Sequence, residues 1–98
     1  MDYQVILSPK AVGDLETIIR YIAQDNPEAA RELGKRLLAK TKELSQFPFK
    51  GQKVSEFDEP NIRQLILKPY RIIYRVDEAK KQVSIARFWH ASRFSPEL

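Results

Sequence analysis

The sequence IRQLILKPYRIIYRVDEAKKQVSIARFW, residues 62–89, holds three apolar runs separated by two turn signals. The first run ends at Lys68-Pro69, because a proline cannot donate to the hydrogen-bond ladder of a sheet. A polar segment, residues 77–81, separates the second run from the third and is typical of a hairpin loop. We therefore predict three strands, at 62–68, 70–76 and 82–89, joined as an antiparallel meander.

The residues before this stretch predict one strand and two helices. Residues 3–7 form a short alternating apolar run, which is typical of a strand. Ser8-Pro9 is a helix start, with serine as the N-cap and proline at the first helical position, and helical spacing continues to about residue 24. Asn26-Pro27 repeats this signal and opens a helix that we expect to end near residue 47. The short connection makes the two helices antiparallel neighbours.

The predicted order is therefore β-α-α-β-β-β, with residues 49–60 as a loop. This order indicates an α+β fold in which an antiparallel helical hairpin packs on one face of a sheet. A chain of 98 residues forms one domain, residues 1–98, because a second would be too small to hold its own core. Its apolar fraction of 43% and charged fraction of 31% are ordinary for a globular protein.

Composition excludes several classes of site. The chain has no cysteine, which excludes disulfides, thiolate nucleophiles and cysteine-based zinc sites. It has one histidine, which excludes a multi-histidine metal site, so we expect no bound metal. No secretory signal and no apolar stretch long enough to span a bilayer is visible. We therefore expect a cytoplasmic protein without a membrane partner.

Positive charge is concentrated in the last third of the chain. Residues 61–98 hold eight basic and three acidic residues, a formal charge of +5, whereas residues 1–60 hold nine basic and ten acidic ones. Five of these eight basic residues lie on predicted strands: Arg63, Lys68, Arg71, Arg75 and Arg87. A basic sheet attached to a near-neutral helical part indicates a surface that meets an anionic partner, such as nucleic acid or a protein that handles it.

Strand alternation divides the second predicted strand into two faces. Arg71, Ile73 and Arg75 share one side, which we expect to be open, so that two arginines grip phosphates around an apolar contact. The alternative is a solvated outer face with no binding role, which antiparallel sheets often have. The core side is expected to hold Tyr70, Ile72, Tyr74 and Val76.

The third predicted strand has a less regular pattern. Simple alternation places Val83, Ile85, Arg87 and Trp89 on one side, unless a bulge shifts the register. Arg87 would then lie among apolar residues, and a half-buried pair with a loop carboxylate is as plausible as a binding role. His90, at the end of this strand, is a candidate general acid or base, or else a residue that caps the strand end.

The runs YRIIYRV (70–76) and IARFWHASR (85–93) resemble the closing half of RelE/ParE-family toxins. The first half of the chain is similar as well, with SPKA (8–11) opening one helix and Asn26-Pro27 opening the next. Leu44, Pro48 and Gly51 match the family's exit from the second helix. The resemblance covers nearly the whole chain. It implies the toxin of a bacterial type II toxin–antitoxin pair, held inactive by a cognate antitoxin and using no cofactor.

The family has two branches, and three features favour the ParE-like branch, which poisons DNA gyrase and has no known nuclease chemistry. The two helices are long relative to the sheet, the chain ends on a His90-x-x-Arg93 motif, and the lysine cluster and C-terminal tyrosine or histidine of many ribosome-dependent nucleases are missing. An enzymatic activity is then not expected. The target-binding residues would be Arg63, Arg71, Arg75, Arg87 and Arg93.

The RelE-like branch is the alternative, and it would make the chain a metal-independent endoribonuclease that acts on mRNA in the ribosome. In that case Arg71 and Arg63 match the phosphate-holding positions, Arg87 is a weaker third match, and His90 would be the proton-transfer group. A third hypothesis is a chain with the toxin fold that has lost activity and only binds its partner.

Overall fold

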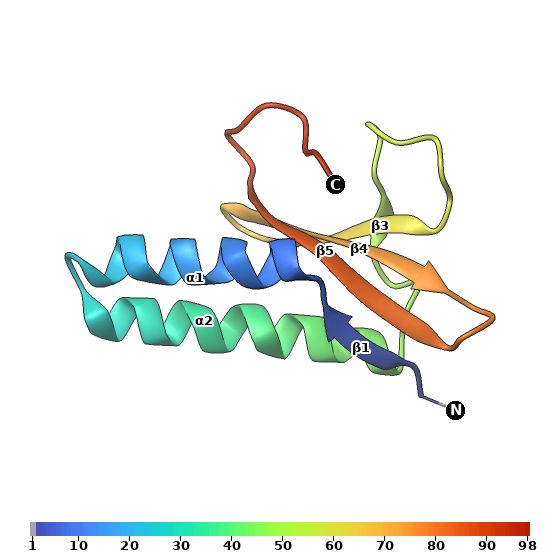
Figure 1. Cartoon of the computed structure of the whole chain (residues 1–98), viewed down its shortest axis with the longest axis horizontal. Helices are drawn as coiled ribbons and strands as arrows, with labels where there is room; N and C mark the ends of the chain where they lie inside the picture. Colours follow the sequence, from blue (N-terminus) through green and yellow to red (C-terminus); the bar gives the residue numbers. More distant parts are fainter. Residues whose placement is uncertain (1) are drawn as a thin grey trace.

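The protein has two helices and a five-stranded mixed sheet, and its computed structural model describes residues 2–98 (Figure 1). The strands pair in the order β1-β5-β4-β3-β2, in which β1 runs parallel to β5 and every other pair is antiparallel. The predicted α+β fold and its meander are confirmed. The elements are β1 Gln4–Leu7, α1 Pro9–Ala23, α2 Pro27–Lys42, the 3₁₀ turn η1 Glu43–Ser45, β2 Gln52–Lys53, β3 Ile62–Leu67, β4 Tyr70–Asp77 and β5 Gln82–His90.

Both helices begin at the capping residues that the sequence predicts. Ser8 Oγ accepts a hydrogen bond from the Ala11 N–H at 3.1 Å, and Asn26 Oδ1 accepts one from the Ala29 N–H at 3.1 Å. The second helix is shorter than predicted, because the chain tightens into η1 after Lys42. Leu44 fits the helical spacing, but it is η1 that buries it.

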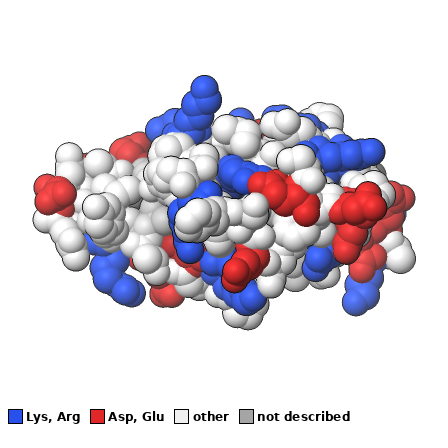
Figure 2. Space-filling view, turned by 90° about the horizontal axis from the view of Figure 1, so that it is seen from above, with Lys and Arg blue, Asp and Glu red and all other residues white. Residues whose placement is uncertain are grey.

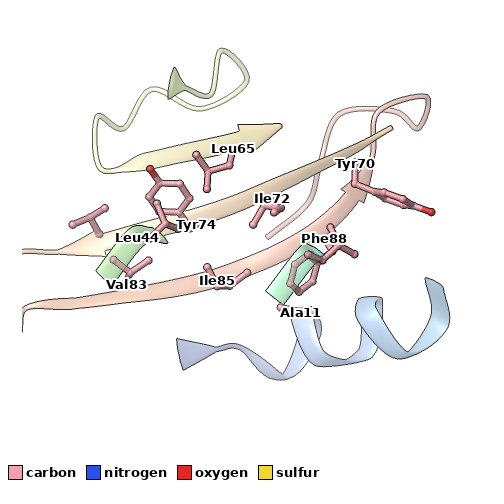
Figure 3. Packing of buried hydrophobic residues seen from close by; sticks show 11 residues of the cluster. Ala11, Leu44, Leu65, Tyr70, Ile72, Tyr74, Val83, Ile85 and Phe88 are labelled. Carbon is pink, nitrogen blue, oxygen red and sulfur yellow. The ribbon is translucent and has the colours of Figure 1, made fainter. Parts of the chain in front are cut away.

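The main core lies between the helical hairpin and one face of the sheet (Figure 3). Tyr70, Ile72, Tyr74 and Val76 of β4 all belong to it, as alternation predicts. The first half of α1 runs beside the sheet, and the far end of the hairpin extends beyond it (Figure 1). In the described part of the chain, no helix has the length and apolar character that a membrane span requires.

A β-bulge at Ala86 breaks the alternation of β5. Ile85 pairs with Tyr74 and Arg87 pairs with Ile73, so Ala86 is the extra residue. Val83 and Ile85 therefore join the main core, whereas Arg87 and Trp89 point to the opposite face. Simple alternation, which places these four on one side, is wrong here, and the bulge named as the exception is found. The inserted residue shifts every side chain after it to the other face.

The face of the sheet opposite the helices, called the outer face below, carries a second core. Ile73 is fully buried there, in a cluster with Val54, Ile62 and Trp89. The prediction that the face with Arg71, Ile73 and Arg75 is open is therefore wrong. It is covered by the loop before β3 and by the C-terminal tail, which contribute Phe57 and Leu98. The predicted loop 49–60 also contains β2, which pairs with the start of β3.

Candidate functional site

The sheet register separates the candidate side chains onto two faces. Arg71 and Arg75 lie on the outer face with Ile73. Arg63 pairs with Tyr74, and His90 pairs with Tyr70, so both belong to the side that faces the helices. The structure therefore does not bring Arg63, Arg71 and His90 together.

Arg63 donates hydrogen bonds to three backbone carbonyls of the connection between α2 and β3. Its Nε donates to Pro60 O at 3.2 Å, and its Nη1 donates to Gly51 O at 3.0 Å and to Phe49 O at 3.4 Å. The guanidinium also lies 5.0 Å from the centre of the Phe49 ring. Because most of its donors are engaged, Arg63 stabilises the α2–β3 connection.

Arg71 is held by a carboxylate of the chain itself. Its Nη1 and Nη2 donate to the two oxygens of Glu56 at 3.0 and 2.9 Å, and its Nε donates to Gln64 Oε1 at 2.6 Å. Hydrogen bonding from Arg71 holds the pKa of Glu56 below its ordinary value. This bidentate geometry is the one by which arginine recognises carboxylate and phosphate groups.

Arg75 is more accessible than Arg71. Its Nη2 lies 4.0 Å from Glu59 Oε2, and the two side chains are 48% and 56% exposed. An exposed pair at this separation contributes little to stability, so Arg75 exchanges partners easily.

Arg87 is locked at the free edge of β5. Beyond Ile85, β1 no longer pairs with this strand, and α1 takes over as its neighbour. Asp14 accepts from Arg87 Nε at 2.7 Å, from Arg87 Nη2 at 2.8 Å and from the Phe88 N–H at 3.0 Å. Hydrogen bonding to Asp14 raises the pKa of Arg87. The predicted pairing is found, with a helix carboxylate instead of a loop carboxylate.

Arg93 lies on the surface against the indole of Trp89, with its guanidinium carbon 4.0 Å from the ring centre. Arg87 also contacts this indole, at 4.8 Å. Within residues 2–98, Arg93 has no carboxylate within ion-pair distance, which distinguishes it from Arg71, Arg75 and Arg87. Arg75 and Arg93 are thus the candidate arginines best placed to contact a partner.

His90 lines a shallow polar cleft of about 270 Å³ with Thr17, Tyr70 and Arg93. Its Nδ1 lies 3.2 Å from the Ser92 backbone nitrogen and 2.7 Å from the Ser92 hydroxyl oxygen. The Tyr70 ring meets the imidazole edge-on at 5.3 Å between centres. The cleft therefore fixes the orientation of a group that can transfer a proton.

Sequence reasoning did not identify the acidic partners of the arginines. Seen from the side where the C-terminal tail and the loop before β3 lie, acidic atoms are interspersed with basic ones and no continuous basic field is visible (Figure 2). Glu56, Asp58 and Glu59 were visible in the sequence as an acidic patch. Because β4 is basic, the negative charge of this patch was the signal that could have identified Glu56 and Glu59 as partners. No local signal marks Asp14.

Sequence and structure comparisons place the chain among toxins. A sequence model of the family described as the ParE toxin of the type II toxin–antitoxin system parDE matches residues 5–93. Toxin RelE2 of Caulobacter vibrioides is 34% identical over 92% of this chain and 97% of its own length. Toxin RelE1 of the same organism is 29% identical over 92% of this chain and 95% of its own length.

Two solved structures extend the comparison to the fold. The chromosomal ParDE system of P. aeruginosa contains a chain that matches with a TM-score of 0.74 and 25% identity, covering 92% of this chain and 97% of that chain. A mutant of E. coli RelE in the free state matches with a TM-score of 0.69 over 94% of this chain and 86% of that chain. Its identity of 18% shows a shared fold alone.

Proposed function

The chain belongs to the ParE toxin family of type II toxin–antitoxin systems, and on that premise we propose that it poisons DNA gyrase by binding. One observation supports binding over RNA cleavage: Arg63, Arg71 and His90, which are the strongest matches of the nuclease hypothesis, are scattered over the sheet. Cleavage of a phosphodiester requires its base, its acid and its charge-stabilising groups around one phosphate.

The separation of these residues follows from the register. Arg71 lies on the outer face, and the other two lie on the helix side. Arg63 is opposite Tyr74 and His90 is opposite Tyr70, so the two positions differ by roughly 13 Å along the strands and about 10 Å across them. One phosphate does not contact groups so placed.

Gyrase inhibition is the activity to measure. Purified chain added to gyrase and plasmid DNA is expected to stop supercoiling and to trap cleaved DNA. Arg75→Ala and Arg93→Ala should each weaken inhibition about fivefold, because each removes an exposed charge worth about 1 kcal/mol at an interface. Lys35→Ala, which removes an exposed charge on α2, is the matched control and should change little. Full supercoiling activity at a saturating concentration of the chain would contradict the proposal.

The cleft around His90 favours a second candidate function, the ribosome-dependent endoribonuclease. Arg93 and Tyr70 share this cleft with His90, so a proton-transfer group and a charge lie near each other. Primer extension on mRNA from expressing cells would then show cuts within translated codons, and His90→Ala would abolish them. Intact mRNA together with falling DNA synthesis would remove this candidate.

We also propose the site at which the cognate antitoxin binds. An apolar groove of about 500 Å³ lies between β1, α1 and α2 and is lined by Leu7, Val12, Leu15, Ile19 and Leu38, with Glu16 and Arg20. Val12 is 43% exposed and Leu38 is 38% exposed, although both are aliphatic. A groove of this kind fits the apolar face of an amphipathic helix. Two of the solved structures that share this fold are toxin–antitoxin complexes.

Val12→Asp is expected to weaken antitoxin binding at least tenfold, because the charge loses its hydration when the antitoxin covers the groove. The fold should survive, since Val12 is half exposed in the free chain. Tyr21→Asp is the control, because Tyr21 is 73% exposed and does not line the groove. Calorimetric titration with the antitoxin expected from the neighbouring reading frame checks this prediction, and equal affinities of the two variants would place the antitoxin elsewhere.

A further inference from the structure

Residues 54–60, called the acidic loop below, cross the outer face of the sheet beside the arginines of β4. Val54 is 1% exposed and anchors the start of this loop in the outer core, where Phe57 also packs. These apolar contacts hold the loop in place, and Glu56 and Glu59 then lie next to Arg71 and Arg75. The chain thus supplies carboxylates to two arginines that alternation places on one face.

The contact between Glu56 and Arg71 has the geometry of a bound ligand. The carboxylate occupies both terminal nitrogens of the guanidinium, and Gln64 orients the fork through Nε. A phosphate offers two oxygens at a similar spacing and is recognised by the same fork. Glu56 is 27% exposed at its side chain, so an incoming anion reaches it from solvent.

The pair also differs from the structural ion pair of Arg87. Asp14 is 12% exposed and also accepts the Phe88 N–H, so its loss would leave a backbone donor without a partner. Within residues 2–98, the Glu56 carboxylate contacts, besides Arg71, the exposed Ser55 hydroxyl at 3.4 Å and its own backbone N–H. Its release therefore costs the loop little beyond the ion pair.

We propose that Glu56 is a built-in competitor that occupies the phosphate-binding fork of Arg71, so that the chain binds a nucleic-acid phosphate through Arg71 only after the acidic loop releases it. The inference rests on the proposed function in one respect: the target carries nucleic acid. The competing ligand is a phosphodiester, supplied by DNA on gyrase or by RNA on the ribosome.

Glu56→Gln tests this competition, because it keeps the size of the side chain and removes its charge. Binding of a short DNA duplex and of a single-stranded RNA of equal length is measured at low salt by fluorescence anisotropy. Glu56→Gln is expected to bind at least one of the two probes about fivefold more tightly than the parent chain. Asp58→Asn is the control, because it removes one exposed charge from the same loop and Asp58 forms no ion pair with Arg71. Its affinity for either probe is expected to increase less than twofold.

Two further results decide between competition and a merely structural pair. Adding Arg71→Ala to Glu56→Gln should abolish the gain, while thermal unfolding shows both variants folded. The proposal is overturned if Glu56→Gln binds neither probe more tightly than Asp58→Asn, or if the gain survives Arg71→Ala. A gain that depends on Arg71, in a chain that leaves gyrase active, would support the competitor and refute gyrase as the target. The probe whose affinity increases more shows whether the chain prefers DNA or RNA.

Discussion

Replacing Asp14 with alanine is expected to lower the free energy of unfolding by about 3 kcal/mol, the loss found when a buried ion pair is left without one partner. The side chains of Asp14 and Arg87 are 12% and 14% exposed, so water does not replace the lost contact fully. The Phe88 N–H loses its acceptor in the same variant, which adds the cost of an unpaired backbone donor.

Urea unfolding measures this loss, and the same helix offers a control. Glu16→Ala removes an exposed carboxylate two residues away and should change the free energy of unfolding by less than about 0.5 kcal/mol. Combining Asp14→Ala with Arg87→Met should recover part of the loss, because the unpaired charge is then removed as well. A loss below about 1 kcal/mol for Asp14→Ala alone would show that the pair does not stabilise the fold.

The Asp14 result bears on how toxicity experiments with Arg87 are interpreted. Arg87 was a candidate target-binding residue, and its replacement also leaves Asp14 without its guanidinium partner. Loss of toxicity in an Arg87 variant therefore reports on folding as well as on binding. Arg75 and Arg93 avoid this ambiguity, because both side chains are exposed and neither is held by a buried carboxylate.

Local signals were sufficient to predict the order of the two helices and of every strand except β2. Ser8 and Asn26 cap the two helices through their own side chains, so each start is determined within a few residues. The core face of β4 follows from strict alternation, because every second residue from Tyr70 to Val76 is apolar and the strand has no bulge of its own.

Features that depend on distant residues were not predictable from local pattern. The bulge at Ala86 reverses the second half of β5, and the sequence around it does not mark the extra residue. Burial of Ile73 requires the loop before β3 and the C-terminal tail to fold back over the sheet. Neither segment is apolar along its length, so neither carries a periodic signal.

The candidate site was predicted in part. The arginines were identified from their positions on strands. The sequence does not show which of them form ion pairs with carboxylates of the same chain. Glu56 lies 15 positions from Arg71, and Asp14 lies 73 positions from Arg87. Charge totals for a segment therefore overestimate the positive surface that the folded chain presents, and this is why the outer face does not form a basic patch.

Gly51→Ala is expected to lower the free energy of unfolding by about 3 kcal/mol, at the upper end of the usual cost of overpacking. A Cβ at this position would lie 2.5 Å from the backbone oxygen of Gln64 and 2.5 Å from the Tyr74 hydroxyl. Tyr74 is fully buried in the main core (Figure 3), and Gln64 belongs to the ladder between β2 and β3. Neither neighbour can move without disturbing packing or pairing.

The Gly51 backbone also forms a buried hydrogen bond that the substitution would strain. Its N–H donates to the Tyr74 hydroxyl at 2.9 Å, and this donation partly offsets the burial that raises the pKa of Tyr74. Moving the chain to accommodate a methyl group would weaken this bond, leaving a buried donor without a partner. The loop from α2 to β3 would then lose one of the contacts that hold it against the sheet.

Gly13→Ala is the matched control for Gly51→Ala and should change stability in the opposite direction. Gly13 lies inside α1, and a Cβ there would meet nothing within 4 Å. Alanine in a helix interior is more stable than glycine by about 0.5–1 kcal/mol, because glycine loses more backbone entropy on folding. Urea unfolding of both variants separates the two effects. Equal stabilities would mean that the close approach at Gly51 does not constrain the fold, and that the α2–β3 connection adapts freely to a side chain.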